Sequence, residues 1–145
     1  MFDIYHNFIV KSSPQKVFDA FCTPLGLDSW WTLRSAGKPV LGNVYTFYFG
    51  PDHDWRAEVI HVVPGTELTW KMKTAMTDWM PTTVGFKLAP LETNTSVAFF
   101  HKGWQEANEH FGITTFCWGQ LLAGLKKYVE GWIDHPFRKA QLSHY

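Results

Sequence analysis

Residues 12–31 read SSPQKVFDAFCTPLGLDSWW and carry two helix-start signals in close succession. Ser13-Pro14 and Thr23-Pro24 each place a capping hydroxyl directly before a proline, a residue favoured in the first turn of a helix. Apolar residues at helical spacing follow each signal, so we predict short helices over 14–22 and from Pro24 to about Trp31. The sequence therefore predicts a tandem pair of short helices near the start of the chain.

Segments with the alternating apolar pattern of β-strands lie on both sides of this helix pair. One precedes it, and the others follow Gly42, where the hydrophobic period changes from helical to two. Pro64-Gly65 is a turn signal between two of them, and we expect a loop from Pro90 to Asn94. The predicted strands cover residues 3–11, 44–49, 55–63, 67–73, 82–89 and 95–102. Consecutive strands joined by short turns indicate an antiparallel meander.

The last third of the chain repeats apolar residues at steps of three and four, from about Gln105 to Gly131. This spacing places them on one side of a long helix. The stripe consists of Phe111, Thr115, Trp118, Leu122, Leu125, Val129 and Trp132. Only this helix is large enough to cover the apolar face of the sheet. We therefore predict an α+β fold in a single domain over residues 1–145, with a curved antiparallel sheet of about six strands wrapped around one long C-terminal helix.

The charge of the chain is balanced, with 13 lysine and arginine residues against 13 aspartate and glutamate residues among 145. A dedicated nucleic-acid binder normally has a basic excess, so this class is disfavoured. The sequence contains neither a signal-peptide pattern nor an apolar run of the roughly 20 residues that cross a bilayer. We therefore expect a cytoplasmic protein that does not insert into membranes.

Aromatic residues are frequent, since 12 Phe, 8 Trp and 5 Tyr contribute 25 rings. A compact core of this size cannot hide so many rings, and some are expected to line a cavity or an interface. The space between the sheet and the long helix is the natural place for such a cavity. The alternative is a core that these rings fill completely.

The residues that carry chemistry in other proteins form no standard motif here. None of the seven histidines has zinc-site spacing, and no phosphate loop or Gly-x-Ser-x-Gly motif occurs, so we predict no metal and no cofactor. Cys22 and Cys117 stand among apolar neighbours and are predicted to be buried free thiols, with a single disulfide between them as the alternative. Solvated strand or turn positions are expected for the carboxylates that come closest to a catalytic pair, namely Asp54, Glu58, Glu67 and Asp78.

Five segments cover nearly the whole chain. They are SSPQKVFDAFCTPLGLDSWW (12–31), GNVYTFYF (42–49), RAEVIHVVPGTELTW (56–70), TTVGFKLAPLETNTSVAFFHKGW (82–104) and CWGQLLAGLKKYVEG (117–131). In this order they resemble the SRPBCC helix-grip superfamily, which is also described as START-like or birch-pollen-allergen-like. Within it the chain most resembles homologues of the C-terminal domain of the heat-shock-protein-90 ATPase activator.

This resemblance implies the helix-grip fold but no single function. The superfamily includes lipid carriers, polyketide cyclases and co-chaperone domains, and function belongs to sites rather than folds. The eukaryotic co-chaperone has an additional N-terminal domain that contributes to chaperone binding. Chaperone activation is therefore not carried over to this sequence from the resemblance.

The predicted cavity would be lined by residues of the sheet and of the long helix. They are Phe47, Trp70, Met72, Phe86, Phe99, His101, Phe111, Thr115, Trp118 and Leu122. His101 is the weak catalytic candidate, as a polar anchor or general base in an apolar pocket. The interpretation we favour for it is a strand-end histidine hydrogen-bonded to the backbone. Met76 and Met80 flank Trp79 and would form an adjustable rim.

Three functional hypotheses follow. The leading one is a non-enzymatic module that binds a small hydrophobic or amphipathic ligand, such as a lipid, in the cavity. The second is a cyclase- or hydrolase-type enzyme that uses the same cavity, with His101 as acid or base. The third is a protein-interaction domain, as a homodimer or a chaperone partner, with exposed Trp or Phe in the contact.

Overall fold

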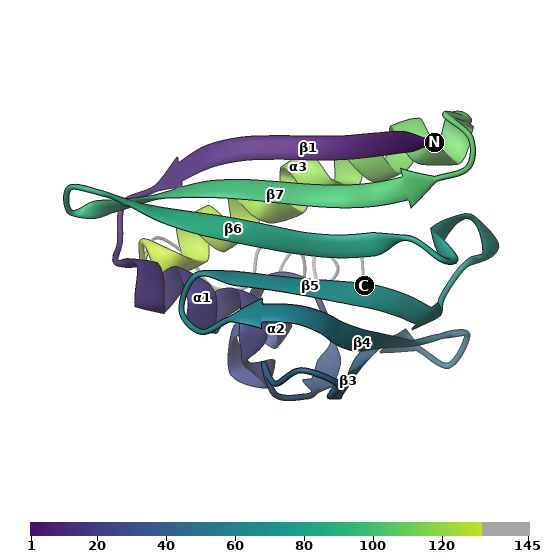
Figure 1. Cartoon of the computed structure of the whole chain (residues 1–145), viewed down its shortest axis with the longest axis horizontal. Helices are drawn as coiled ribbons and strands as arrows, with labels where there is room; N and C mark the ends of the chain where they lie inside the picture. Colours follow the sequence, from purple (N-terminus) through teal and green to yellow (C-terminus); the bar gives the residue numbers. More distant parts are fainter. Residues whose placement is uncertain (132–145) are drawn as a thin grey trace, which may run out of the picture.

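The computed structural model describes residues 1–131, and these form one curved antiparallel sheet of seven strands with three α-helices on one side (Figure 1). The strands are β1 (Phe2–Val10), β2 (Arg34–Ala36), β3 (Val44–Gly50), β4 (His53–Val63), β5 (Glu67–Thr74), β6 (Thr83–Leu91) and β7 (Asn94–Trp104). The helices are α1 (Pro14–Cys22), α2 (Pro24–Trp30) and α3 (Glu109–Val129), with a 3₁₀ turn, η1, at Thr77–Trp79. The strand order is β1-β7-β6-β5-β4-β3-β2. This architecture confirms the α+β helix-grip prediction.

The tandem helices begin where the two capping signals stand. The Ser13 hydroxyl accepts from the N–H of Lys16, and the Thr23 hydroxyl accepts from the N–H of Gly26 at 3.0 Å. A glycine is required where the second helix crosses the first, because a Cβ on Gly26 would lie 2.5 Å from the carbonyl oxygen of Asp19. Local capping and this close approach together hold α1 and α2 as a bent pair.

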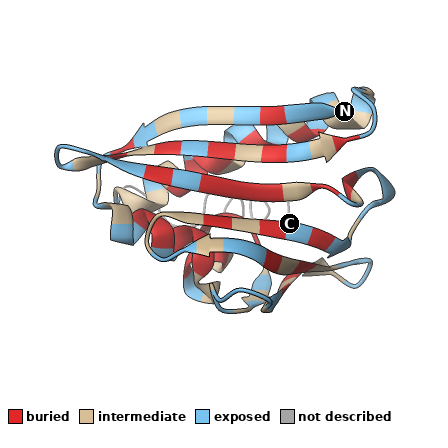
Figure 2. Cartoon of the chain, in the orientation of Figure 1, coloured by how far each residue is buried: buried red, intermediate tan, exposed pale blue. Residues whose placement is uncertain are grey.

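The core lies between the concave face of the sheet and the helices. Buried residues alternate with exposed or half-buried ones along β7, whereas along the edge strand β1 mostly half-buried residues alternate with exposed ones (Figure 2). The register aligns Trp70 on β5 with Val84 on β6, and Val84 with His101 on β7. Their side chains therefore share the face toward the helices, as the period of two requires.

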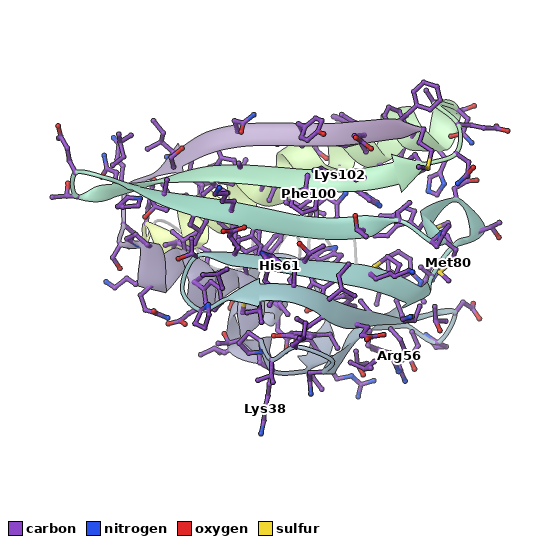
Figure 3. All side chains as sticks on the ribbon, in the orientation of Figure 1. Lys38, Arg56, His61, Met80, Phe100 and Lys102 are labelled. Carbon is purple, nitrogen blue, oxygen red and sulfur yellow. The ribbon has the colours of Figure 1, made fainter. Side chains whose placement is uncertain are left out.

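The opposite face of the sheet is open to solvent. Figure 3 shows Phe100 and Lys102 on this face, where the Lys102 ammonium lies 4.6 Å from the centre of the Phe100 ring. The Phe100 ring lies over Gly85 on the neighbouring strand, since a Cβ there would come 2.5 Å from it. Gly85 is thus the position that lets this ring lie flat against the sheet.

The strands differ from the sequence prediction most clearly at β2, at Pro90 and at the start of β4. The strand β2 was not predicted, because three residues are too few to show a period. Pro90 was expected in a loop, yet it belongs to β6 and pairs with Thr95 at the hairpin end, where a missing N–H is tolerated. The strand β4 begins at His53 rather than at residue 55.

The helix α3 also differs in detail. It begins at Glu109, not near Gln105, because the side chain of Asn108 caps it by accepting from the N–H of Phe111 at 2.9 Å. The described part of the predicted stripe includes Trp118, Leu122 and Leu125, which are buried, whereas Thr114 rather than Thr115 is the buried threonine. Trp132 lies outside the described residues.

The prediction for the cysteines was half wrong. Cys22 is a buried free thiol, but Cys117 is exposed. Its apolar neighbours Phe116 and Trp118 misled the sequence reading, because on a helix adjacent residues point in directions about 100° apart. Trp118 faces the core and Cys117 does not.

Candidate binding site

Five aromatic rings form a closed circle at one end of the sheet–helix interface. Trp31 follows α2, Phe49 is on β3, Trp55 on β4, Trp79 in η1 and Trp118 on α3. Around the circle, neighbouring ring centres are 5.5, 4.9, 4.8, 5.9 and 5.0 Å apart. Separations of this size are typical of attractive aromatic pairs. Five separate segments therefore meet at one aromatic circle.

These rings line an open hollow of about 200 Å³. The remaining lining residues are Met76, His110, Ile113, Thr114, Cys117 and Leu121. Neither lysine nor arginine belongs to this lining. Met76 lines the hollow and is exposed, so half of the predicted methionine rim is in place, while Met80 lies farther along the β5–β6 connection (Figure 3).

Polar contacts join η1 to the start of α3 beside the hollow. The Asp78 carboxylate in η1 lies 2.9 Å from Nδ1 of His110 and accepts from the side-chain amide of Asn108 at 3.4 Å. His110 and Asn108 belong to the first turn and cap of α3. This contact holds η1, and with it Trp79, against the start of the helix.

His101 lies behind the hollow in a fully buried hydrogen-bond network. The Trp118 indole N–H donates to Nδ1 of His101 at 3.1 Å, and Nε2 of His101 lies 2.8 Å from the Thr82 hydroxyl. Because Nδ1 accepts, the neutral ring carries its proton on Nε2 and donates to Thr82, whose hydroxyl donates to the Trp79 carbonyl. Burial, with His110 nearby, lowers the pKa of His101 to about 3, so the ring is neutral at physiological pH.

This geometry corrects the sequence reading of His101. The expected partner was the backbone, but both ring nitrogens are paired with side chains. Nδ1, the nitrogen with the lone pair, is occupied by Trp118, and the residue is completely buried. In this arrangement His101 therefore has no lone pair free to accept a proton from a substrate.

Nine of the ten predicted lining residues lie outside the lining of the hollow, and most of the ten are packed in the core. Buried positions are held by Phe47, Trp70, Met72, Phe86, Phe99, His101, Trp118 and Leu122, and half-buried positions by Phe111 and Thr115. Of these ten, Trp118 belongs to the lining of the aromatic hollow. Strand and helix periodicity thus identified residues that face the core, but most of these residues pack against one another instead of lining a cavity.

Sequence reasoning missed Trp31, Phe49, Trp55 and Trp79 as a group. Phe49 shares the alternation of Tyr45 and Phe47, so its inward direction was visible in the sequence. The three tryptophans stand at the ends of elements, where no period applies. Only the folding of the sheet brings these ends together.

The described residues contain neither a metal-binding group of three His, Cys, Asp or Glu side chains nor a helix long and apolar enough to cross a membrane.

Comparison with known proteins gives the family. The family model described as "Activator of Hsp90 ATPase homolog 1-like protein" matches residues 11–130. The chain belongs to this family. The solution structure of the Aha1 dimer from Colwellia psychrerythraea is 30% identical, with a TM-score of 0.82 over 91% of this chain and 98% of that one.

More distant structures share the fold alone. Protein MLL2253 from Mesorhizobium loti is 20% identical, with a TM-score of 0.77 over 87% of this chain and 95% of that one. DynU16, from the dynemicin biosynthetic locus, is 17% identical, with a TM-score of 0.77 over 88% of this chain and 47% of that one. No curated protein sequence matches the chain.

Proposed function

We propose that this protein binds a small hydrophobic or amphipathic molecule in the aromatic hollow. The observation that carries the proposal is the closed circle of five rings from five separate segments around a space of about 200 Å³. Open spaces with apolar walls and a few polar groups are the usual binding sites of small molecules. The helix-grip superfamily that the sequence resembles includes lipid carriers, which supports this proposal without naming a ligand.

The driving force is burial of apolar surface. At about 25 cal/mol per Å², covering some 150–200 Å² of a ligand gives about 4–5 kcal/mol before the costs of association. Contacts from the ring walls add to this, so a ligand with one or two rings is expected to bind in the millimolar to micromolar range. The probes below are therefore used up to millimolar concentration.

The exposed thiol of Cys117 gives a direct test, because it belongs to the lining while Cys22 is buried. We expect one of the two thiols to react quickly with a disulfide reagent in the folded protein. Indole, as the probe, is expected to slow this reaction saturably. An unchanged rate at every indole concentration, together with no co-purified molecule in native mass spectrometry, would overturn the proposal.

Thr114 and Thr115 provide matched variants for the same test. Thr114 is buried and belongs to the lining, whereas its neighbour Thr115 does not. A methionine fills irregular gaps without fixed shape, so Thr114→Met is expected to weaken indole protection of Cys117 at least fivefold. Thr115→Met is expected to leave protection within twofold of the wild-type value. Equal effects of both variants would contradict the assignment of the site.

A second candidate function is self-association. The relative from Colwellia psychrerythraea was solved as a dimer. In this chain β1 lies at the sheet edge with Phe2, Tyr5 and Ile9 exposed, and an edge strand is a template for pairing. If the chain forms a homodimer through β1, the wild type is expected to sediment with the mass of a dimer at micromolar concentration. The Tyr5→Lys variant is expected to sediment as a monomer. Val44→Lys, on β3 near the other edge, is the control, and a monomer in the wild type contradicts the idea.

A further inference from the structure

One histidine at the wall of the hollow has a ring nitrogen with a free lone pair. Nδ1 of His110 lies 2.9 Å from the carboxylate of Asp78. An ionised carboxylate only accepts, so in the neutral ring the proton is on Nδ1 and the lone pair is on Nε2. Within residues 1–131, no side chain or backbone group donates to this Nε2. In the buried His101, by contrast, the lone pair is occupied by the Trp118 indole.

The free nitrogen lies on the part of the ring that is left to face the hollow. Nδ1 is turned toward Asp78, and the ring stands at 80° to that of Trp104, with ring centres 5.4 Å apart. Neither Asp78 nor Trp104 belongs to the lining, whereas His110 does, with a side chain that is 26% exposed. The accessible ring edge is therefore the one opposite Nδ1, and this edge carries Nε2.

A second polar group stands next to this nitrogen on α3. Thr114 follows His110 by four residues, so both side chains lie on the same helix face, one turn apart. Thr114 also belongs to the lining, and its hydroxyl can donate or accept. Cys117 and Leu121 continue the lined face toward the other end of the helix. The polar groups of the α3 wall are thus concentrated at its N-terminal end.

Size and charge restrict the molecules that fit. An apolar cavity of about 150 Å³ accommodates benzene, and sites for drug-sized ligands begin at about 300 Å³. The hollow, at about 200 Å³, therefore suits one or two fused rings. None of its lining residues is an aspartate, glutamate, lysine or arginine. Because an ion without a partner is costly to bury, the site favours an uncharged molecule.

A hydrogen-bond donor on that molecule would pair with the free lone pair of His110. Resting on the binding function proposed above, we propose that the ligand is an uncharged aromatic molecule of one or two rings, such as a phenol, whose hydroxyl or N–H group donates to Nε2 of His110. Its ring lies within the aromatic circle, where stacked or edge-on contacts are available. Its donor points to the start of α3, beside the Thr114 hydroxyl.

The probes p-cresol and p-xylene test this proposal, because they have nearly the same shape and differ by a hydroxyl in place of a methyl group. Binding is followed by the ¹⁵N–¹H signals of the tryptophan side chains at pH 8, where histidine is ordinarily neutral. The measured quantity is the preference, defined as the Kd of p-xylene divided by the Kd of p-cresol. Comparing this ratio between variants cancels the different hydrophobicity of the two probes.

Two histidine variants isolate the acceptor. A net hydrogen bond corresponds to about three- to tenfold in affinity, so the preference is expected to fall by this factor in His110→Phe. His61→Phe is the matched control, because His61 also faces a carboxylate, that of Glu67 at 3.3 Å, but is exposed on β4 outside the lining. This control is expected to keep the preference within twofold of the wild type.

The wild type gives a second readout if His110→Phe does not fold. Either probe displaces water from Nε2 of His110, but only p-cresol donates to this nitrogen in its place. The ¹⁵N signal of this Nε2 is therefore expected to move farther downfield with p-xylene than with p-cresol. Equal shifts would contradict the contact.

The outcomes separate this inference from the proposed function. An unchanged preference in His110→Phe, or an equal fall in His61→Phe, overturns the donor contact and leaves the binding function standing. Tighter binding of benzylammonium than of p-cresol also overturns it, in favour of a cation site at the ring faces. No perturbation of any hollow residue by either probe overturns both the inference and the function on which it rests.

Discussion

The indole N–H of Trp118 on α3 donates to Nδ1 of His101 on β7 across 3.1 Å, inside the core. Nε2, the second ring nitrogen of His101, donates to the Thr82 hydroxyl, and this hydroxyl donates to the Trp79 carbonyl. The helix, the sheet and η1 are thus joined by one neutral histidine with every hydrogen bond satisfied. A fully satisfied buried network of this kind fixes the arrangement of its members, and it supports the ring wall of the hollow from behind.

Loss of the Trp118 N–H is expected to destabilise the protein beyond the loss of ring surface. Trp118→Phe leaves Nδ1 of His101 buried without a donor, at a cost of about 1–3 kcal/mol. Trp104→Phe is the matched control, because Trp104 is equally buried but its N–H has no acceptor among the described residues. Urea unfolding should show Trp118→Phe less stable than Trp104→Phe by that amount. Equal losses would mean that the hydrogen bond contributes nothing.

The buried histidine predicts a loss of stability in mild acid. Burial holds the pKa of His101 at about 3 in the folded protein, whereas in the unfolded chain the imidazole takes up the proton near its ordinary pKa of 6.5. The stabilisation is fully present above pH 6.5 and falls by up to about 1.4 kcal/mol per pH unit below it. In urea unfolding at pH 7, 6 and 5, His101→Gln should lack this slope. Parallel pH profiles for the two proteins would contradict the prediction.

Glu130 joins the end of α3 to the end of β1. Its carboxylate accepts from the Lys11 backbone N–H at 2.7 Å and from the Lys126 ammonium at 2.6 Å. Although burial alone would raise the pKa of Glu130, these donors bring it below the ordinary value. Glu130→Gln is therefore expected to lose about 1 kcal/mol at pH 7.

The pH dependence of this loss has a definite sign. A lowered folded-state pKa stabilises the protein above the unfolded value of 4.5, and this contribution disappears as the pH falls through the folded pKa. The difference between wild type and Glu130→Gln should therefore shrink in acid. Lys127→Gln, at an exposed position on the same helix, is the control for charge alone. A difference that stays constant with pH would rule out the ionic contact.

Two glycines are expected to respond oppositely to alanine. In Gly85→Ala the new Cβ would lie 2.5 Å from both the Leu68 carbonyl and the Phe100 ring, so we expect a loss of about 1–3 kcal/mol. In Gly112→Ala the Cβ meets nothing within 4 Å on α3, and a gain of about 0.5–1 kcal/mol is expected. Thermal unfolding measures both. A stabilised Gly85→Ala would show that the sheet accommodates the methyl group without strain.

Much of the fold could be predicted from local patterns. The Ser13 and Thr23 caps, the alternation in β3 to β7 and the three- and four-residue steps of α3 each act within one segment, so the printed sequence contains them. The predictions failed at positions whose burial depends on residues that are distant in the sequence but adjacent in space. Thr114 rather than Thr115 faces the core, and Cys117 is exposed beside a buried Trp118. Both depend on the rotation of α3 against the sheet, which no helical period specifies.

The sequence by itself determined the order of the elements apart from the short strand β2, the helix-grip class and the abundance of aromatic rings. Only the tertiary structure decided that Trp31, Phe49, Trp55, Trp79 and Trp118 share one circle, while Trp70 and Phe86 fill the core. The physical reason is that periodicity reports which side of an element a residue is on. Which element ends meet depends on sheet curvature and on the crossing of α3. The hydrogen bonding of His101 also depends on the tertiary structure, since its two partners, Thr82 and Trp118, lie 19 and 17 residues away in the chain.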